Sequence, residues 1–206
     1  MPVCPVTEIP LVKATAETLK GYGSLVATPE ECDIEIVQWP AQGWRGIEPG
    51  TGDEGGTTEG VFSCEWAGYE LHMVNEAVGG DYIGGWSREP YVDEAESVEP
   101  SSRERAIIWH ANYHPDGGQL FFPLDEGFFV APLALPGDDT KPDSFIAFWF
   151  DGTQGVYIHP GVWHEGVFPA NPRQRFFDKQ GKVHARVNVD FVKEFGCYLS
   201  FPLSPN

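Results

Sequence analysis

Hydrophobic and polar residues alternate along most of this chain, and little of it shows helical periodicity. After Arg105, seven short apolar or alternating runs follow one another, separated by turn residues: AIIWHANYH, GQLFFPL, GFFVAPLAL, SFIAFWF, GVYIHPGVWHEGVF, KVHARVNVDFV and CYLSFPL. Three earlier runs, DIEIVQW, GVFSCEW and YELHMVNEA, alternate in the same way. Short strands at regular spacing are typical of an antiparallel sandwich or barrel. We therefore expect an all-β chain.

The remaining segments are expected to be one short helix and two loops. The stretch KATAETLKGYG, residues 13–23, predicts a peripheral helix that ends at its glycines. Residues 46–60 are glycine-rich and acidic, and residues 87–105 are charged and bounded by proline, so both are expected to be long loops, either surface excursions or lids. A length of 206 residues fits one domain, spanning residues 1–206.

The charge and cysteine content limit the partners and the compartment. A formal net charge of −18 argues against nucleic-acid and anionic-membrane partners, because both would be repelled. The four cysteines are scattered without a metal or disulfide spacing, and the amino terminus has no secretory pattern. We expect a cytoplasmic protein with free thiols. An anionic substrate would need local positive charge from an arginine or a metal ion.

Strand parity places polar side chains together on two of the expected strands. One face of the first carries His110, Asn112 and His114, and one face of the second carries Arg186, Asn188 and Asp190. Such a face either points to solvent, as in a sandwich layer, or lines a polar pocket inside a barrel. We also expect Asp190 to pair with Arg186 on this face, since a buried guanidinium needs a partner.

Histidine placement favours the pocket. The chain has six histidines, and His159 and His164 flank a Pro-Gly turn in YIHPGVWHEGVF. Imidazole is both the commonest metal ligand and the usual acid or base near neutral pH. These two residues, with His110, His114 and nearby Gln119, predict a functional pocket. We expect His114 and His164 to approach one another there.

Several motifs resemble those of the ureidoglycolate lyase family, formerly called ureidoglycolate hydrolase. HPDGGQLFFPL has the form H-P-x-G-x-Q-x-F-x-P, and the same order of motifs continues with GVYIHPGVWHEGVF; LKGYGSLV and VNVDF match as well. The resemblance runs from Leu19 to about Asp190, less the two long loops. It implies a cupin fold, which is a small jelly-roll β-barrel, and a role in allantoin degradation within purine catabolism.

The resemblance to cupins also implies a divalent metal ion. Pro160 and His164 satisfy the P-x-G-x-x-H half of the cupin signature, and the other half is altered to His110-x3-His114-x4-Gln119. The implied ligands are His110, His114, Gln119 and His164, for nickel, zinc, manganese or iron, with no organic cofactor. Glutamine in place of glutamate removes a charge and weakens a site for hard cations.

Two positions depart from the family pattern. Glu76 and Phe191 stand where the family carries arginines that could bind the substrate carboxylate. Arg186 is the nearest substitute. The implied substrate-binding residues are Arg186, Asn75, Asn188 and Gln119.

The implied reaction splits ureidoglycolate into glyoxylate and urea without consuming water, so it is a lyase reaction. It needs a base for the hydroxyl proton and an acid for the departing nitrogen, and the expected catalytic residues are His114 with His159 or Asp190. Two alternatives remain open: a metallocupin of another reaction type, such as an oxygenase or isomerase, and a non-catalytic small-molecule binder. The expected partner is a small carboxylic acid, and fold analogy suggests a homodimer.

Overall fold

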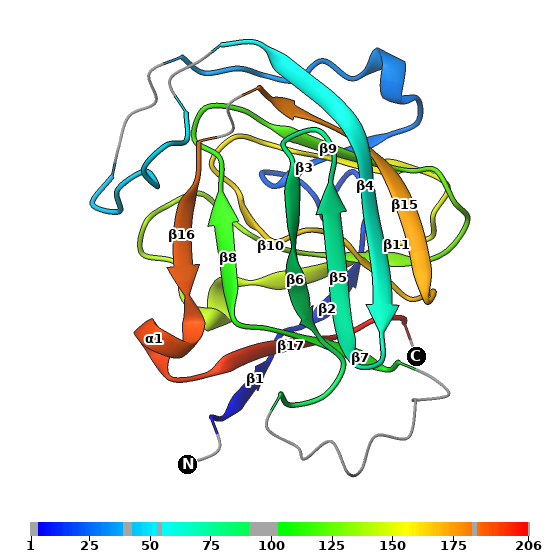
Figure 1. Cartoon of the computed structure of the whole chain (residues 1–206), viewed down its shortest axis with the longest axis vertical. Helices are drawn as coiled ribbons and strands as arrows, with labels where there is room; N and C mark the ends of the chain where they lie inside the picture. Colours follow the sequence, from blue (N-terminus) through cyan, green and yellow to red (C-terminus); the bar gives the residue numbers. More distant parts are fainter. Residues whose placement is uncertain (1–3, 39–42, 53–54, 91–102, 183–184, 206) are drawn as a thin grey trace.

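The structure is a computed structural model that describes residues 4–38, 43–52, 55–90, 103–182 and 185–205. Nearly all the regular secondary structure of its described part is strand, arranged in two sheets (Figure 1). The described part contains one α-helix, α1 (Phe191–Phe195), and 3₁₀ turns at Pro29–Glu31 and Pro142–Ser144. The expectation of an all-β chain is confirmed.

The larger sheet has ten strands and the smaller has seven. The order in the larger is β1 (Val6–Glu8), β17 (Tyr198–Pro202), β7 (Arg105–Ile108), β6 (Gly80–Trp86), β5 (Glu70–Asn75), β4 (Thr57–Ala67), β15 (Arg173–Gly181), β9 (Gln119–Pro123), β12 (Gly155–Ile158) and β3 (Gly23–Val26). The order in the smaller is β16 (Val187–Asp190), β8 (His110–Tyr113), β13 (Trp163–His164), β10 (Phe129–Ala134), β11 (Ile146–Phe150) and β2 (Leu11–Lys13), with β14 (Phe168–Pro169) on β10. Pairing is antiparallel except for β1 with β17 and β2 with β11. Neither sheet closes on itself among the described strands.

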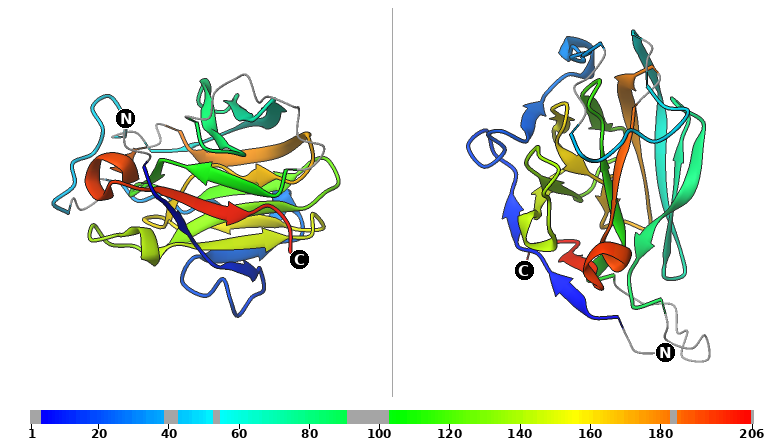
Figure 2. Two further views of the ribbon diagram at one scale, coloured as in Figure 1. Left: turned by 90° about the horizontal axis from the view of Figure 1, so that it is seen from below. Right: turned by 90° about the vertical axis from the view of Figure 1, so that its left-hand side faces the viewer.

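The two sheets face one another across an aromatic core (Figure 2). Phe129 of β10 meets Phe176 of β15 with ring centroids 5.1 Å apart, and Phe168 of β14 meets Phe201 of β17 at the same distance. All four rings are essentially inaccessible to solvent. Since burying one phenylalanine side chain contributes roughly 1.5–3 kcal/mol, these contacts hold the two layers together.

The helix expected over residues 13–23 is wrong. Lys13 belongs to β2, and the residues after it form turns. The hydroxyls of Thr15 and Thr18 accept from one another's backbone N–H groups, and the Thr18 hydroxyl donates to the carbonyl of Lys13. Such local bonds compete with helical ones. Leu19 is fully buried, so this segment packs against the core as a turn.

The α-helix lies instead at the end of a run that was expected to be a strand throughout. The Asp190 carboxylate accepts a hydrogen bond from the backbone of Lys193 and caps the helix. Gly196, with φ of 68°, ends it in the left-handed conformation. This short helix follows β16 directly, so Asp190 is the last residue of the strand. Its side chain is held at the helix end by the capping hydrogen bond.

The expected loops are described in part. Residues 46–52 and 55–56 lack regular structure, but β4 begins at Thr57, so the last four residues of the expected loop belong to this strand. Residues 53–54 and 91–102 lie outside the described residues, and the single-domain expectation stays a prediction. The four cysteines are free thiols, as expected. No helix in the described ranges has the length and apolar character needed to cross a bilayer.

Candidate functional site

A cavity of about 560 Å³ lies between the sheets, with residues of both in its walls. His110 and Asn112 of β8, His164 of β13 and Asn188 of β16 come from the smaller sheet. Gln119 of β9 and Asn75 of β5 come from the larger. His114 and Arg186, each one residue beyond a strand end, also line it. The polar faces of the two strands identified by parity therefore meet at one cavity.

At one end of the cavity, His114, His164 and Gln119 lie together. The two imidazole rings have centroids 4.9 Å apart, and His164 Nε2 lies 3.1 Å from Gln119 Oε1. His164 Nδ1 lies 2.8 Å from the carbonyl of Val162, and His114 Nδ1 lies 2.9 Å from that of Ala185. The expected approach of His114 and His164 is confirmed.

These carbonyl contacts determine which ring nitrogen carries hydrogen. A carbonyl only accepts, so Nδ1 donates in both rings, and Nε2 of a neutral ring carries the lone pair. Burial lowers the pKa of His164 to about 4, so this ring is neutral near pH 7. Its Nε2 therefore presents a lone pair toward the cavity and Gln119.

Behind Gln119 lies Asp178, which the sequence analysis did not identify. Asp178 is fully buried and accepts hydrogen bonds from Gln119 Nε2 at 2.8 Å and Gln180 Nε2 at 2.9 Å. Burial raises the pKa of Asp178 to about 7, despite these donors. A sequence signal existed, because Asp178 and Gln180 share strand parity with core residue Phe176.

With Gln119 Nε2 donating to Asp178, Gln119 Oε1 and His164 Nε2 face one another as two acceptors. Because His164 is neutral, two arrangements satisfy both atoms: a cation against both, or a reversed Gln119 amide that donates to His164 and accepts from protonated Asp178. The donors that this cluster offers to a metal ion of the kind that imidazole binds are His164 Nε2 and Gln119 Oε1, with the His114 ring beside them.

The four-ligand metal set implied by the motifs is not brought together. Within the described ranges, no group of three or more histidine, cysteine, aspartate or glutamate side chains is arranged to hold a metal ion. His110 lies instead against Glu165, with its Nε2 3.1 Å from Glu165 Oε2. The set that remains has two imidazoles and one amide but no carboxylate, which makes it weak for a hard cation.

The pair of His110 and Glu165 forms the second polar cluster of the cavity. Glu165 is only 1% exposed, whereas His110 is 24% exposed and reachable from the cavity. Desolvation of its hydroxyl group and the adjacent Glu165 carboxylate, to which it hydrogen-bonds, raise the pKa of Tyr82. Glu165 was missed although it follows His164 directly, because a strand residue next to an inward-facing one is expected to face away.

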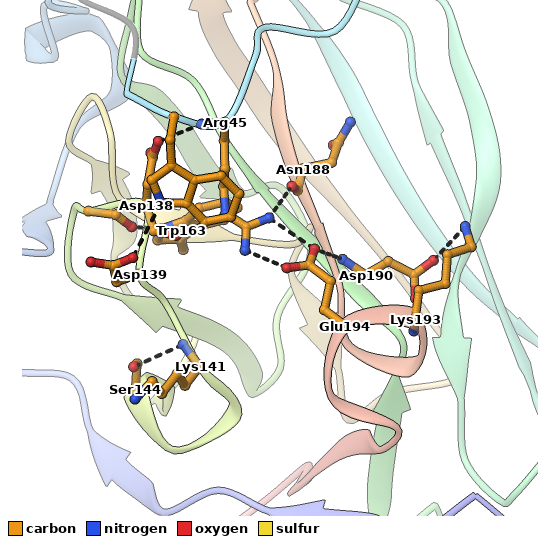
Figure 3. Close-up of polar contacts among 12 residues, drawn as sticks. Arg45, Asp138, Asp139, Lys141, Ser144, Trp163, Asn188, Asp190, Lys193 and Glu194 are labelled. Atoms are coloured by element: carbon orange, nitrogen blue, oxygen red, sulfur yellow. Dashed lines mark hydrogen bonds and ion pairs between the residues drawn. The ribbon is translucent and has the colours of Figure 1, made fainter.

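Arg186 and Asn188 line the cavity, but Asp190 does not pair with Arg186. Arg186 Nε lies 2.9 Å from Glu48 Oε2, and Asn188 Nδ2 donates to the same oxygen at 3.3 Å. Asp190 caps α1 and lies 2.8 Å from Lys193 Nζ (Figure 3). The expected Arg186–Asp190 pair is therefore wrong, since the helix cap holds Asp190 outside the residues that line the cavity.

His159 does not line the cavity either. The strand β12 ends at Ile158, and the following turn passes through Gly161, which has φ of 79°. The backbone N–H of His159 donates to the carbonyl of Tyr22, and its ring packs 5.6 Å from that of Tyr157. The turn thus sends His159 and His164 to different surroundings.

The two positions that depart from the family pattern have structural roles. Phe191 is fully buried and its ring packs at 5.2 Å against Phe145. Glu76 is exposed and accepts from the backbone of Val61 at 3.3 Å. Asn75, beside it, is buried, lines the cavity and hydrogen-bonds to Asp178.

A separate cluster around Arg45 supports the strand that carries Asn188 (Figure 3). Arg45 is 8% exposed and donates to the carbonyls of Asp138 and Asn188 and to Glu194 Oε1, at 2.9, 3.1 and 2.9 Å. Its guanidinium also lies 5.5 Å from the Trp163 ring centroid. The cluster joins β16, α1 and the loop after β10.

Comparisons with known proteins agree with the motifs. The family model described as ureidoglycolate lyase matches residues 99–193. A ureidoglycolate lyase of Azotobacter vinelandii is 34% identical over 110 residues, covering 46% of this chain and 66% of that protein. One of Pseudomonas aeruginosa strain LESB58 is 31% identical over 126 residues, covering 52% of this chain and 75% of the relative. One of Stutzerimonas stutzeri is 40% identical over 77 residues, covering 36% and 45%. The chain thus spans only part of each relative's length.

Proposed function

Since the chain belongs to the ureidoglycolate lyase family, we propose that it cleaves the C–N bond of a ureido hydroxy acid, either ureidoglycolate or a close analogue. The products from ureidoglycolate are glyoxylate and urea. The observation that carries this proposal is one cavity holding two imidazole clusters, His114 with His164 and His110 with Glu165. The cluster of His114 and His164 suits the hydroxy-acid end of the substrate, and the pair of His110 and Glu165 suits proton transfer.

The reaction moves one proton between two atoms bound to the same carbon. The hydroxyl loses its proton, its oxygen forms the carbonyl of glyoxylate, the C–N bond breaks, and the departing nitrogen gains a proton. His110 is placed to take the hydroxyl proton and return it to the nitrogen, while Glu165, 3.1 Å away, stabilises the transient imidazolium. This role replaces the one that the motifs suggested for His159 and Asp190.

The other cluster in the same cavity binds the hydroxy acid. His114, His164 and Gln119 are the residues that would hold a divalent ion, which when bound lowers the pKa of the substrate hydroxyl and fixes its orientation. His114 Nδ1 and His164 Nδ1 keep both rings oriented through their carbonyl partners. If a metal is needed, dialysis against a chelator abolishes turnover, and one divalent ion per chain restores it.

Arg186 and Asn188 serve the substrate carboxylate. Arg186 is held by Glu48, which also accepts from Asn188, so the three side chains form one network at the cavity wall. A guanidinium binds a carboxylate through two parallel N–H donors, and Arg186 lines the cavity while its Nε lies beside Glu48. Arg186 thus supplies positive charge in a chain whose net charge is −18.

Three further features belong to this proposal. Two facing, mostly antiparallel sheets with the site between them support a cupin-type jelly roll. Four free thiols support a cytoplasmic location. Unpaired edges at β3 and β16 among the described strands support a homodimer, which sedimentation velocity would test.

The decisive experiment is turnover of ureidoglycolate by the purified full chain, with urea and glyoxylate measured together. Equal amounts of the two products are expected. His110→Asn should lower kcat by at least about 10²-fold, whereas His72→Asn, at a half-exposed histidine beside Glu70 outside the cavity, should leave it unchanged. Oxygen consumption without urea would indicate an oxygenase, and binding without turnover would indicate a non-catalytic binder.

A further inference from the structure

The cavity is larger than ureidoglycolate requires. Ureidoglycolate has about nine non-hydrogen atoms, whereas cavities of roughly 300–1,000 Å³ enclose ligands the size of typical drugs. At about 560 Å³, this cavity falls within that range. The two polar clusters and Arg186 account for the hydroxy acid and its ureido group, so part of the cavity has no role in the proposed reaction.

The unused part is an aromatic wall next to His110, formed by Trp86, Trp109 and Tyr82. The rings of Trp86 and Trp109 have centroids 4.7 Å apart, and the Trp109 ring is 4.2 Å from that of His110. Tyr198 packs edge-on against Trp86 at 6.1 Å. Trp86 and Trp109 are each half-buried, and both line the cavity.

The rim beside this wall carries large apolar side chains together with one carboxylate, Asp81. Val78 and Tyr82 line the cavity from the β5–β6 hairpin and remain 39% and 36% exposed. Large apolar side chains left exposed around a concave site mark a surface that a ligand covers. Flat rings at the wall select a flat apolar group, because offset stacking adds about 0.5–1.5 kcal/mol beyond the area buried.

The position of the wall indicates which end of the substrate carries this group. The wall adjoins His110, which in the proposed reaction returns the proton to the departing nitrogen of the ureido group. Resting on the proposed function, we propose that the physiological substrate is a ureido hydroxy acid whose distal nitrogen bears a planar apolar substituent of about the size of an aromatic ring. Trp86 and Trp109 bind that substituent.

The reaction stays balanced with such a substrate. The hydroxyl proton passes through His110 to the departing nitrogen, the C–N bond breaks, and the products are glyoxylate and a substituted urea. No oxidant, reductant or water is consumed. The proposal therefore changes the leaving group and leaves the proton transfer as it was.

The test compares ureidoglycolate with its phenyl-substituted analogue, which is the adduct of phenylurea and glyoxylate. For the unmodified protein, kcat/KM should be at least about tenfold higher for the phenyl compound. In Trp86→Ala that preference should fall about tenfold. Trp44→Ala, which removes an exposed tryptophan outside this cavity, should leave the preference unchanged. Trp86→Phe, which keeps a ring, should retain most of it, and this variant also answers the question if Trp86→Ala fails to fold.

Binding measurements separate this proposal from the proposed function. Phenylurea should bind the unmodified protein and quench tryptophan fluorescence, and urea should not. If neither compound is cleaved, the proposed function fails, and phenylurea binding that is lost in Trp86→Ala still supports the aromatic subsite. Turnover of ureidoglycolate as good as or better than that of the phenyl analogue overturns the subsite while the lyase function stands. Stronger binding of a trimethylammonium-bearing urea than of phenylurea overturns it as well, because the wall would then select a cation.

Discussion

The Arg45 cluster and the His110 cluster both place charged side chains near the same strands, but they differ in how their polar atoms are satisfied. Arg45 makes hydrogen bonds to two carbonyls and a carboxylate, and Asp138 accepts from the Arg45 backbone and the Tyr113 hydroxyl. In the cavity, His110 Nδ1 and Asn112 Oδ1 are buried without a hydrogen-bond partner among the described residues. Folded proteins leave few such atoms unpaired, so each one needs an explanation. A satisfied cluster stabilises the fold, and an unsatisfied one is prepared for a ligand.

The largest effect should come from removing the charge beside His110. Glu165→Gln keeps the shape of the side chain but no longer stabilises an imidazolium, so kcat should fall by about 10²–10⁴-fold with little change in the free energy of unfolding. Glu70→Gln removes the carboxylate from a similar histidine pair outside the cavity and should have no kinetic effect. Full activity in Glu165→Gln would show that the cavity cluster is structural.

Arg186→Leu should produce the next largest effect. If Arg186 binds the substrate carboxylate, kcat/KM for acidic substrates should fall by roughly 10²-fold while neutral amide analogues are nearly unaffected. Steady-state kinetics with the matched acid and amide measure this directly. Equal losses for both substrates would place Arg186 with the structural cluster instead, together with its partner Glu48.

Arg45→Leu tests the other side of the comparison. Losing charge-assisted bonds to Glu194 should lower the free energy of unfolding by about 2–3 kcal/mol, measured in urea. Arg175→Leu breaks a more exposed pair with Asp125 and should lower the free energy of unfolding by much less than Arg45→Leu does. An Arg45 variant with unchanged stability would contradict the structural role.

The smallest effect is a pH dependence from Asp178. Its pKa of about 7 lies above the unfolded value, so the folded state binds more protons, and stability from this group is present at low pH and lost as pH rises through 7. His164, with a pKa lowered to about 4, contributes the opposite slope between pH 4 and its ordinary value near 6.5. Between pH 6 and 8 the unmodified protein should lose about 1 kcal/mol of its free energy of unfolding through Asp178. Asp178→Asn should abolish this loss, which urea unfolding at several pH values would measure. Parallel pH profiles for variant and unmodified protein would contradict this.

Much of the fold and part of the site could be predicted from local patterns. Alternation identified the strands, and the Pro-Gly turn with HPDGGQ identified the convergence of His114, His164 and Gln119. The helix over residues 13–23 was predicted wrongly, because threonine hydroxyls form local bonds that helix propensity does not register. Glu165 and Asp178 were missed, since their roles depend on what surrounds them after folding.

The sequence by itself determined that the chain is built from strands and which side chains share a face, because alternation is a property of neighbouring residues. It also determined the family, through motifs that are contiguous in the chain. Only the tertiary structure decided which members of a face serve the cavity. Arg186 and Asn188 do so, while Asp190, on the same face, caps a helix. Glu48, the partner of Arg186, comes from a loop far away in the sequence. The face on which a strand side chain lies depends only on its neighbours in the chain. The partner that it meets across the cavity depends on how distant segments pack, which is decided only when both sheets have assembled.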